Sequence, residues 1–368
     1  MTMVDAPAMI DSPMLRTARI GLTDYWNDSC AVEELRYAIE RGAVGGTTNP
    51  PIVLEVLDKE RAYWVPRVRQ LAAANPAWSE VDLTWALVEA MAVRGAAELA
   101  PVHARTAGRK GWQSVQTNPQ HYTNAERMVE QAVHFTGLAS NMQVKIPATA
   151  AGIVAIEEAT ARGVNVNATV CFTVPQALAV AESLERGLRR LAAAGGEPAR
   201  LAPVVTIMVG RLDDWMKSIV ERDQLAIDPR VLDWAGIAAF KRAYGIFRER
   251  GYRGRLLVAA FRHVLHWTEF VGGDVVLTMP HAWQVRYNTS GIDPVSRIDV
   301  PVEPAIVDEL CRRIPDFSRA YEPDGLAPAE FDAYGATART LRQFIGAYHD
   351  LTAKVRDIVL PNPDIAAA

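Results

Sequence analysis

Short apolar segments alternate with longer segments of helical periodicity through most of this 368-residue sequence. Eight of the short segments are expected to be strands, at residues 19–24, 43–47, 111–117, 142–146, 164–172, 202–208, 255–261 and 275–278. Helical segments separate most of them, and such an alternation is typical of α/β proteins. It favours a single (β/α)8 TIM barrel over a doubly wound sheet.

The barrel is expected to form one domain over residues 1–368, with its core at about 19–290. Asp28 and Ser29 precede a helical pattern at residues 32–40 and are interpreted as its cap. A helical insertion is predicted after the second strand, broken at Asn75 and restarted by a capping box at Ser79. A C-terminal extension at about 300–360 is expected to add further helices.

Composition excludes several functional classes. Only 22% of residues are charged and the net charge is -4, which argues against a nucleic-acid or polybasic membrane surface. No apolar run approaches the ~20 residues that span a bilayer. The three cysteines have no metal or redox spacing, and the first fifteen residues do not fit a signal peptide, so a cytoplasmic location is expected.

Lys145 is the lysine in this sequence whose context points to chemistry. The chain has six lysines; Lys145 alone lies inside an apolar run, Met-Gln-Val-Lys-Ile, that Pro147 ends as a buried strand would end. Burial lowers the pKa of an amine from ~10.4 and makes it available for attack on a carbonyl. The alternative is a strand-end lysine whose ammonium reaches solvent.

Function in a barrel of this kind belongs at the carboxyl ends of the strands. The polar residues predicted there are Thr23, Asp24, Asn49, Gln116, Asn118, Lys145, Asn167, Thr169, Thr206, Arg211 and Arg262. One amine, one carboxylate, neutral hydrogen-bonding groups and two guanidinium groups suit a phosphorylated carbonyl substrate. Two alternatives stay open: Asn49 merely closes a turn, or Arg211 pairs with Asp213 or Asp214.

Five motifs follow one another along the chain and resemble the signatures of the transaldolase family. They are Gly-Thr-Thr-Asn-Pro-Pro (46–51), Val-Lys-Ile-Pro-Ala-Thr (144–149), Val-Asn-Ala-Thr (166–169), Val-Gly-Arg (209–211) and Ala-Phe-Arg (260–262). The resemblance implies a barrel with a Schiff-base lysine on its fourth strand. It also implies transfer of a three-carbon dihydroxyacetone unit between sugar phosphates, without a metal or an organic cofactor.

The same resemblance implies roles for individual residues. Lys145 would be the nucleophile, Asn49 and Asn167 would hold substrate hydroxyls, and Thr169 would position a water. Arg211 and Arg262 would bind phosphate. Thr23 stands in the slot of the family's acid/base aspartate, and Asp24 follows it, so that Asp24 is the candidate only if a bulge turns it inward.

The sequence also departs from the family at several sites. Gln116 stands where a transaldolase has a water-activating glutamate, and a glutamine cannot take a proton. Fructose-6-phosphate aldolases resemble this chain at that position. Thr206 and Ala260 replace common serines, and Met208 replaces an aromatic residue.

The expected function is therefore Schiff-base transaldolase chemistry on small sugar phosphates. Two alternatives remain: a stand-alone aldolase that acts on fructose 6-phosphate or another anionic ketose, such as a sulfonated sugar, and a catalytically silent sugar-phosphate binding protein. Neither nucleic acid nor membrane is an expected partner, and a homo-oligomer is left open.

Overall fold

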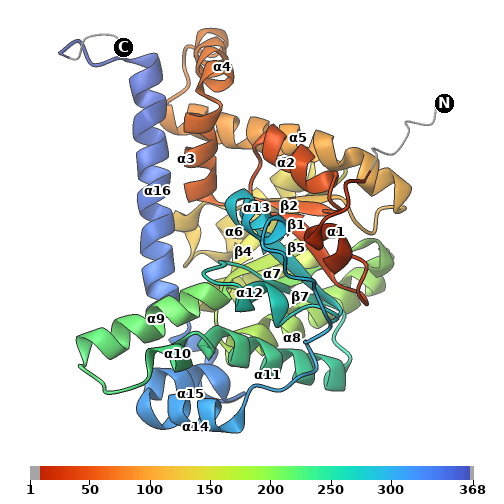
Figure 1. Cartoon of the computed structure of the whole chain (residues 1–368). Coiled ribbons are helices and arrows are strands. Elements are labelled where there is room, and N and C mark those ends of the chain that lie inside the picture. Colours follow the sequence, from red (N-terminus) through yellow and green to blue (C-terminus); the bar gives the residue numbers. More distant parts are fainter. Residues whose placement is uncertain (1–8, 365–368) are drawn as a thin grey trace.

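Eight parallel strands close into a barrel in the order of the chain, from β1 to β8 (Figure 1). The computed structural model describes residues 9–364. The strands are β1 (Asp24–Asn27), β2 (Gly45–Thr47), β3 (Trp112–Gln116), β4 (Met142–Pro147), β5 (Val166–Cys171), β6 (Val204–Ile207), β7 (Arg255–Val258) and β8 (Val275–Met279). The predicted single (β/α)8 barrel is confirmed.

Helices surround the barrel and extend it at two places. Those that accompany the strands are α1 (Pro13–Thr17), α2 (Val32–Ile39), α6 (Ala125–Thr136), α7 (Ala150–Ala161), α8 (Val174–Ala193), α9 (Val209–Arg222), α10 (Pro229–Leu232), α11 (Ala235–Arg250), α12 (Leu265–Thr268) and α13 (His281–Asn288). The predicted insertion after β2 consists of α3 (Pro50–Lys59), α4 (Arg61–Ala74) and α5 (Glu80–Arg105). The tail adds α14 (Pro304–Arg313), α15 (Pro315–Tyr321) and α16 (Gly335–Val359). Short 3-10 turns occur at Pro119–His121 (η1), Pro198–Arg200 (η2) and Pro328–Glu330 (η3).

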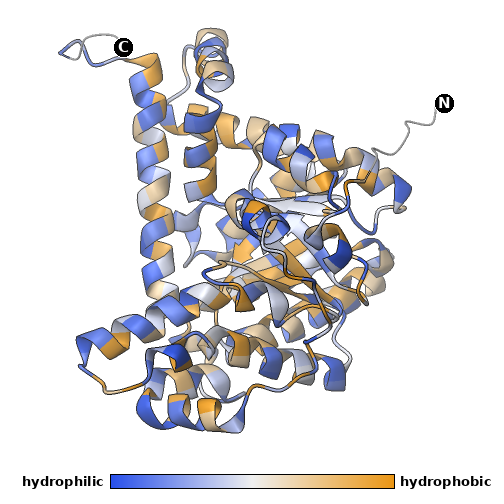
Figure 2. Cartoon of the chain, viewed as in Figure 1, coloured by the Kyte–Doolittle hydropathy of each residue, from blue (hydrophilic) through white to orange (hydrophobic). Residues whose placement is uncertain are grey.

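The hydrophobic effect explains this arrangement. Nearly every strand residue is buried, as expected for a parallel sheet that is covered by helices on its outside and filled by side chains within. Figure 2 shows hydrophobic colours gathered in the central strands and hydrophilic colours on the outer helices.

The passage from β2 into α3 follows directly from its sequence. A side chain at Gly45 would lie 2.5 Å from the ring of Trp26, so only glycine allows the two strands to pack here. Pro50 and Pro51 occupy the first helical positions, where a missing amide hydrogen costs nothing. The predicted capping box also forms, between Ser79 and Asp82 at the start of α5.

The first strand was predicted five residues too early. Residues 19–23 are turns in which Gly21 has φ 61°, a left-handed conformation that ends any extended segment there. The strand begins at Asp24 and Asp28 follows its carboxyl end. The predicted cap at Asp28 and Ser29 is also wrong, because α2 is capped by Ala31 without a side-chain hydrogen bond.

This shift moves Asp24 and Thr23 to the amino end of the barrel, opposite the predicted site. Asp24 is paired there with Lys110, which precedes β3, at 2.6 Å and with Arg255, the first residue of β7, at 2.7 Å. Thr23 exchanges hydrogen bonds with the main chain of Gly272 and Gly273, just before β8. The expectation that either residue lies at the carboxyl end of a strand is therefore wrong.

The C-terminal helix α16 runs across one side of the carboxyl end of the barrel. It packs against α3, α4 and α5 of the insertion, and further along against η1, β5 and α9 (Figure 1). The side-chain amide of Gln120 on η1 donates a 2.9 Å hydrogen bond to Nε2 of His349 on α16. Within residues 9–364, no helix is both long and apolar enough to cross a bilayer.

The ion pairs of Asp24 predict a structural role. The Asp24→Asn variant should lose roughly 2 kcal/mol of unfolding free energy. This loss lies between those expected for breaking an exposed and a buried ion pair, because Asp24 is buried whereas Lys110 and Arg255 are partly exposed. Urea denaturation would measure the loss. Asp274→Asn is the matched control, because Asp274 also pairs with Arg255 but is half exposed and should cost less. Equal stability of Asp24→Asn and the wild type would contradict a structural role.

Candidate active site

Lys145 lies on β4 with its side chain inside the barrel. It is only 4% exposed, and its Nζ donates a hydrogen bond to the main-chain oxygen of Thr48, 3.0 Å away beyond the end of β2. Burial lowers the pKa of Lys145 to about 8; the negative charge of Asp28 opposes this shift, and the positive charge of Arg211 adds to it. A useful fraction of the amine is therefore unprotonated near neutral pH.

Asp28 is the carboxylate that faces this lysine. It follows the carboxyl end of β1, and its Oδ1 accepts a hydrogen bond of 2.6 Å from the hydroxyl of Thr47 on β2. Burial raises the pKa of Asp28, while Lys145 and the Thr47 hydroxyl act in the opposite direction. The two groups thus have pKa values shifted toward each other, an arrangement that suits proton transfer beside a nucleophilic amine.

Neutral polar side chains line the barrel wall next to Lys145. Gln116, Lys145 and Asn167 are register partners on the adjacent strands β3, β4 and β5, so their side chains lie side by side. The Asn167 amide accepts a 2.7 Å hydrogen bond from Thr206 and donates a 3.1 Å hydrogen bond to Ser114. Both contacts fix the direction of the amide and leave one of its two N–H groups for a ligand.

Two further polar atoms in this layer have no protein partner among the described residues. They are the Oε1 atom of Gln116 and the hydroxyl of Thr169, both buried. Thr169 precedes Val170, whose φ of 51° marks a break in the register between β5 and β6. Bulges of this kind redirect side chains next to functional sites. A buried hydroxyl and a buried amide oxygen can together hold a water molecule or a substrate hydroxyl.

Asn49 has the structural role that was left open as an alternative. Its side chain accepts a 3.0 Å hydrogen bond from the main-chain nitrogen of Ile52 and so caps α3. The cap uses the carbonyl oxygen of the side chain. Among the described residues the amide N–H groups of Asn49 have no hydrogen-bond partner, and Asn49 lines a small hollow together with Gln116 and Tyr348.

Two guanidinium groups lie at the rim of the barrel. Arg211 is in the first turn of α9, and Arg262 follows β7. Burial and the positive charge of Arg262 lower the pKa of Arg211 to about 10. The side chain of Arg262 makes a two-point ion pair with Asp214, at 3.1 and 2.9 Å. A cation whose charged form is weakened by a second cation nearby is a suitable site for an anion.

The alternative pairing of Arg211 with Asp213 or Asp214 does not occur. Arg211 instead reaches α16, where it donates hydrogen bonds to Gln343 and Thr340 and lies over the ring of Phe344. The tail therefore contributes directly to the rim of the site.

The structure thus brings together Lys145, Gln116, Asn167, Thr169 and Thr206 and puts Asn49, Arg211 and Arg262 around them, while it excludes Thr23 and Asp24. The sequence analysis missed Asp28 as a site residue. The usual length of a loop between a strand and a helix, ~2–6 residues, was the signal that pointed to it. A strand that ends at Asn27 leaves four residues before α2, and Asp28 is the first of them. No comparable signal pointed to Gln343, which lies on the C-terminal helix.

Known proteins resemble this chain over most of its length. The family model described as transaldolase/fructose-6-phosphate aldolase matches residues 25–305. The chain belongs to this family. A protein named transaldolase from Thiobacillus denitrificans is 26% identical over 344 residues, which cover 86% of this chain and 90% of the relative. Another of that name from Mycobacterium ulcerans is 29% identical over 286 residues, covering 71% and 76%.

The match begins at Tyr25, the second residue of β1, so it includes Asp28 and leaves out Thr23 and Asp24. The C-terminal helix α16 lies beyond the matched residues, although Gln343 on this helix contacts Arg211.

The shifted pKa of Lys145 predicts how its reactivity depends on pH. Reductive methylation of Lys145 with formaldehyde and a borane should rise with pH and reach half its maximum near pH 8, because only the unprotonated amine reacts. Peptide mass spectrometry would follow the reaction site by site. Lys59 is an internal reference: burial acts against its charge, but hydrogen bonds to Glu34 and Glu55 outweigh this and raise its pKa. Parallel pH profiles for the two lysines would contradict the assignment.

Proposed function

We propose that this protein transfers a three-carbon dihydroxyacetone unit from a ketose phosphate to an aldose phosphate through a Schiff base on Lys145. The observation that carries the proposal is the pair formed by a buried amine of pKa about 8 and a carboxylate, Asp28, whose pKa is raised. Class I aldol chemistry needs these two groups: an amine that attacks a carbonyl, and a base that exchanges a proton with a hydroxyl.

In the first half of the reaction, Nζ of Lys145 attacks the C2 carbonyl of the ketose, and loss of water gives an iminium ion. The Asp28 carboxylate then takes the proton of the C4 hydroxyl. The C3–C4 bond breaks, its electron pair moves into the iminium to form an enamine, and the remaining part of the sugar leaves as an aldehyde.

In the second half, the enamine attacks the carbonyl carbon of an incoming aldehyde and forms a new C3–C4 bond. Asp28 returns its proton to the new hydroxyl. Water then hydrolyses the iminium, which releases the new ketose and restores the amine of Lys145. The protonated and ionised forms of Asp28 are both needed, which its raised pKa favours.

The other polar residues have assigned parts in this scheme. Asn49 and Asn167 donate hydrogen bonds to hydroxyls of the three-carbon unit, and Thr206 holds the Asn167 amide in place. Gln116 and Thr169 hold the water that is released and consumed. Arg211 and Arg262 bind the phosphate of the donor and of the acceptor, which directs both sugars into the same orientation.

A stand-alone aldolase is the second candidate, and Gln116 favours it. Its amide oxygen is buried without a partner among the described residues, beside Lys145 on the next strand, and an amide cannot take a proton from water. In such an enzyme the enamine is protonated, and dihydroxyacetone is released without an acceptor aldehyde.

Trapping the covalent intermediate tests the proposal. Incubation with fructose 6-phosphate followed by borohydride should add a three-carbon mass to the peptide that contains Lys145. In Asp28→Asn the imine still forms but the C3–C4 bond does not break, so we expect the whole-sugar mass and turnover reduced by roughly 100-fold. Peptide mass spectrometry distinguishes the two adducts.

Two variants serve as controls. Lys145→Met should give no adduct, and Asp24→Asn, which changes the same residue type at the opposite end of the barrel, should give the three-carbon adduct. Binding of fructose 6-phosphate to the wild type without any adduct would contradict the proposal and favour a silent binding protein. Adduct formation followed by release of dihydroxyacetone, with no transfer to an added aldose phosphate, would favour the aldolase.

Replacement of the amide at position 116 gives a separate prediction. Gln116→Glu should speed formation and hydrolysis of the imine by on the order of 10-fold, because the carboxylate can exchange protons with the water that Thr169 holds. Stopped-flow mixing with fructose 6-phosphate would measure both steps.

Gln120→Glu is the matched control, because it adds the same charge on η1 outside the barrel. An unchanged or slower rate in Gln116→Glu would mean that Gln116 does not hold the reacting water.

A further inference from the structure

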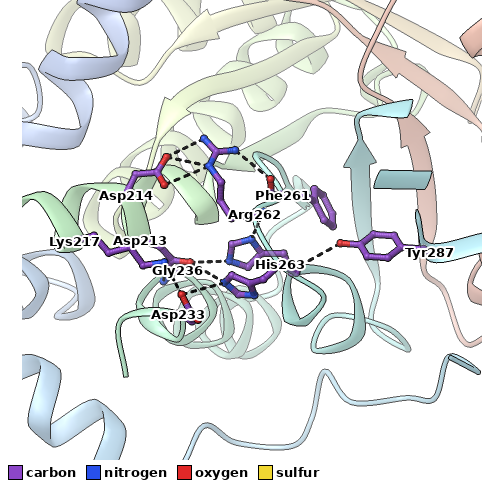
Figure 3. Close-up of polar contacts among 10 residues, drawn as sticks. Asp213, Asp214, Lys217, Asp233, Gly236, Phe261, Arg262, His263 and Tyr287 are labelled. Carbon is purple, nitrogen blue, oxygen red and sulfur yellow. Dashed lines mark hydrogen bonds and ion pairs between the residues drawn. The ribbon is translucent and has the colours of Figure 1, made fainter. Parts of the chain in front are cut away.

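A buried carboxylate in α9, that of Asp213, organises the loop that carries Arg262. Asp213 is 0% exposed and accepts hydrogen bonds from the main chain of Gly236 at 2.7 Å and from His266 at 2.8 Å (Figure 3). His263 approaches the same oxygen at 3.3 Å. Burial acts against the charge of Asp213, but the hydrogen bonds from His263 and His266 outweigh it and lower its pKa.

The hydrogen bonds of His266 fix its tautomer. The main-chain N–H of Arg262 donates to Nδ1 of His266 at 3.0 Å, so that this nitrogen carries a lone pair and no proton. The ring proton therefore lies on Nε2, which donates to Asp213. His266 is buried and joins the carboxylate to the main chain of Arg262.

The same three side chains, those of Asp213, His263 and His266, have the residue types of a metal site, with one ligand atom of each within 4.8 Å of the others. The tautomer of His266 argues against metal binding. A neutral imidazole has one lone pair, and here Nδ1 uses it to accept the Arg262 N–H. A metal on Nε2 would require either a doubly deprotonated ring or loss of that hydrogen bond, so the cluster is a hydrogen-bond network.

Both ends of Arg262 are thus held by neighbouring carboxylates on α9. Asp213 holds its main chain through His266, and Asp214 holds its guanidinium directly. Arg211 lies two residues before Asp213 in the same helical turn. One turn of α9 therefore sets the position of both arginines at the rim.

Close main-chain packing completes this connection. The residue before Phe261, Ala260, has φ 67°, an unusual conformation for a residue with a side chain. Its carbonyl oxygen approaches Gly210 so closely that a Cβ there would be 1.9 Å away. The loop after β7 and the start of α9 are in direct contact on either side of the two arginines.

We propose that His266 is a positioning residue of the anion site: its imidazole links Asp213 to the main chain of Arg262 and so fixes Arg262 relative to Arg211. The inference rests on the proposed function for the identity of the anion, a sugar phosphate. Two guanidinium groups recognise one phosphate only when their separation and direction are held, and displacements near 0.5 Å are enough to weaken such a site.

Kinetics with matched donors tests this role. His266→Ala should raise the KM for fructose 6-phosphate about 10-fold or more, with a much smaller change for unphosphorylated fructose and little change in kcat. His263→Ala is the matched control, since His263 also contacts Asp213 but its ring does not hold the Arg262 N–H. Equal KM increases for both donors would overturn the proposal, because they would show a general structural effect.

Two conservative variants separate the contacts of the imidazole. His266→Asn keeps an acceptor at the position of Nδ1, which binds the Arg262 N–H, and His266→Gln keeps a donor at the position of Nε2, which binds Asp213. We expect His266→Asn to recover more of the KM for the phosphorylated donor than His266→Gln. The opposite order, at equal thermal stability, would contradict a role through the Arg262 main chain.

A binding measurement keeps this inference separate from the proposed chemistry. In calorimetric titration with inorganic phosphate, His266→Ala should weaken binding about 10-fold, whereas His263→Ala should bind as the wild type does. If the wild-type protein binds phosphate but forms no adduct on Lys145 with fructose 6-phosphate, the result would count against the Schiff-base proposal alone. Unchanged phosphate affinity in His266→Ala would overturn the positioning role, whatever the reaction.

Discussion

The free-energy cost of enclosing an amine inside the barrel governs the rest of the site. Lys145 is 4% exposed, and its one protein hydrogen bond, to the Thr48 carbonyl, does not replace the hydration of an ammonium ion. Part of that cost is avoided by loss of the proton, so the pKa falls to about 8. The same burial raises the pKa of Asp28. Burial thus shifts the pKa of both groups that the proposed reaction uses, one as nucleophile and one as acid/base.

The two ends of the barrel differ in whether their buried polar groups have partners. At the amino end, Asp24 is paired with Lys110 and Arg255, and Arg255 is paired again with Asp274. At the carboxyl end, the hydroxyl of Thr169 and the amide oxygen of Gln116 lack partners among the described residues. Satisfied groups stabilise a fold, whereas unsatisfied buried groups need a ligand or water. This contrast explains why the carboxylate that the sequence suggested, Asp24, is structural.

The sequence predicted the barrel because alternating strands and helices leave few other arrangements, and it predicted Lys145 because an isolated lysine in an apolar strand is unusual. It failed at β1, where residues 19–24 look as apolar as a strand but Gly21 adopts a left-handed turn. Because site residues were sought at the carboxyl ends of strands, ending the first strand at residue 24 instead of 27 exchanged Asp28 for Asp24. The contact between Arg211 and Gln343 on α16 could not be predicted, because 132 residues separate them and only the tertiary fold brings them together.

Electrostatics connects the rim of the site with its centre. The positive charge of Arg211 is one of the causes that lower the pKa of Lys145, and Arg262 in turn lowers the pKa of Arg211. An anion bound between the two arginines reduces their repulsion and screens their effect on the lysine. A bound anion should therefore raise the pKa of Lys145. In the proposed mechanism, the same negative charge would favour the cationic iminium on this lysine. Arg262 is held in place by Asp214 and His266, and Arg211 by its contacts with α16. In the proposed reaction, the two arginines would influence the reactivity of Lys145 as well as the binding of the substrate.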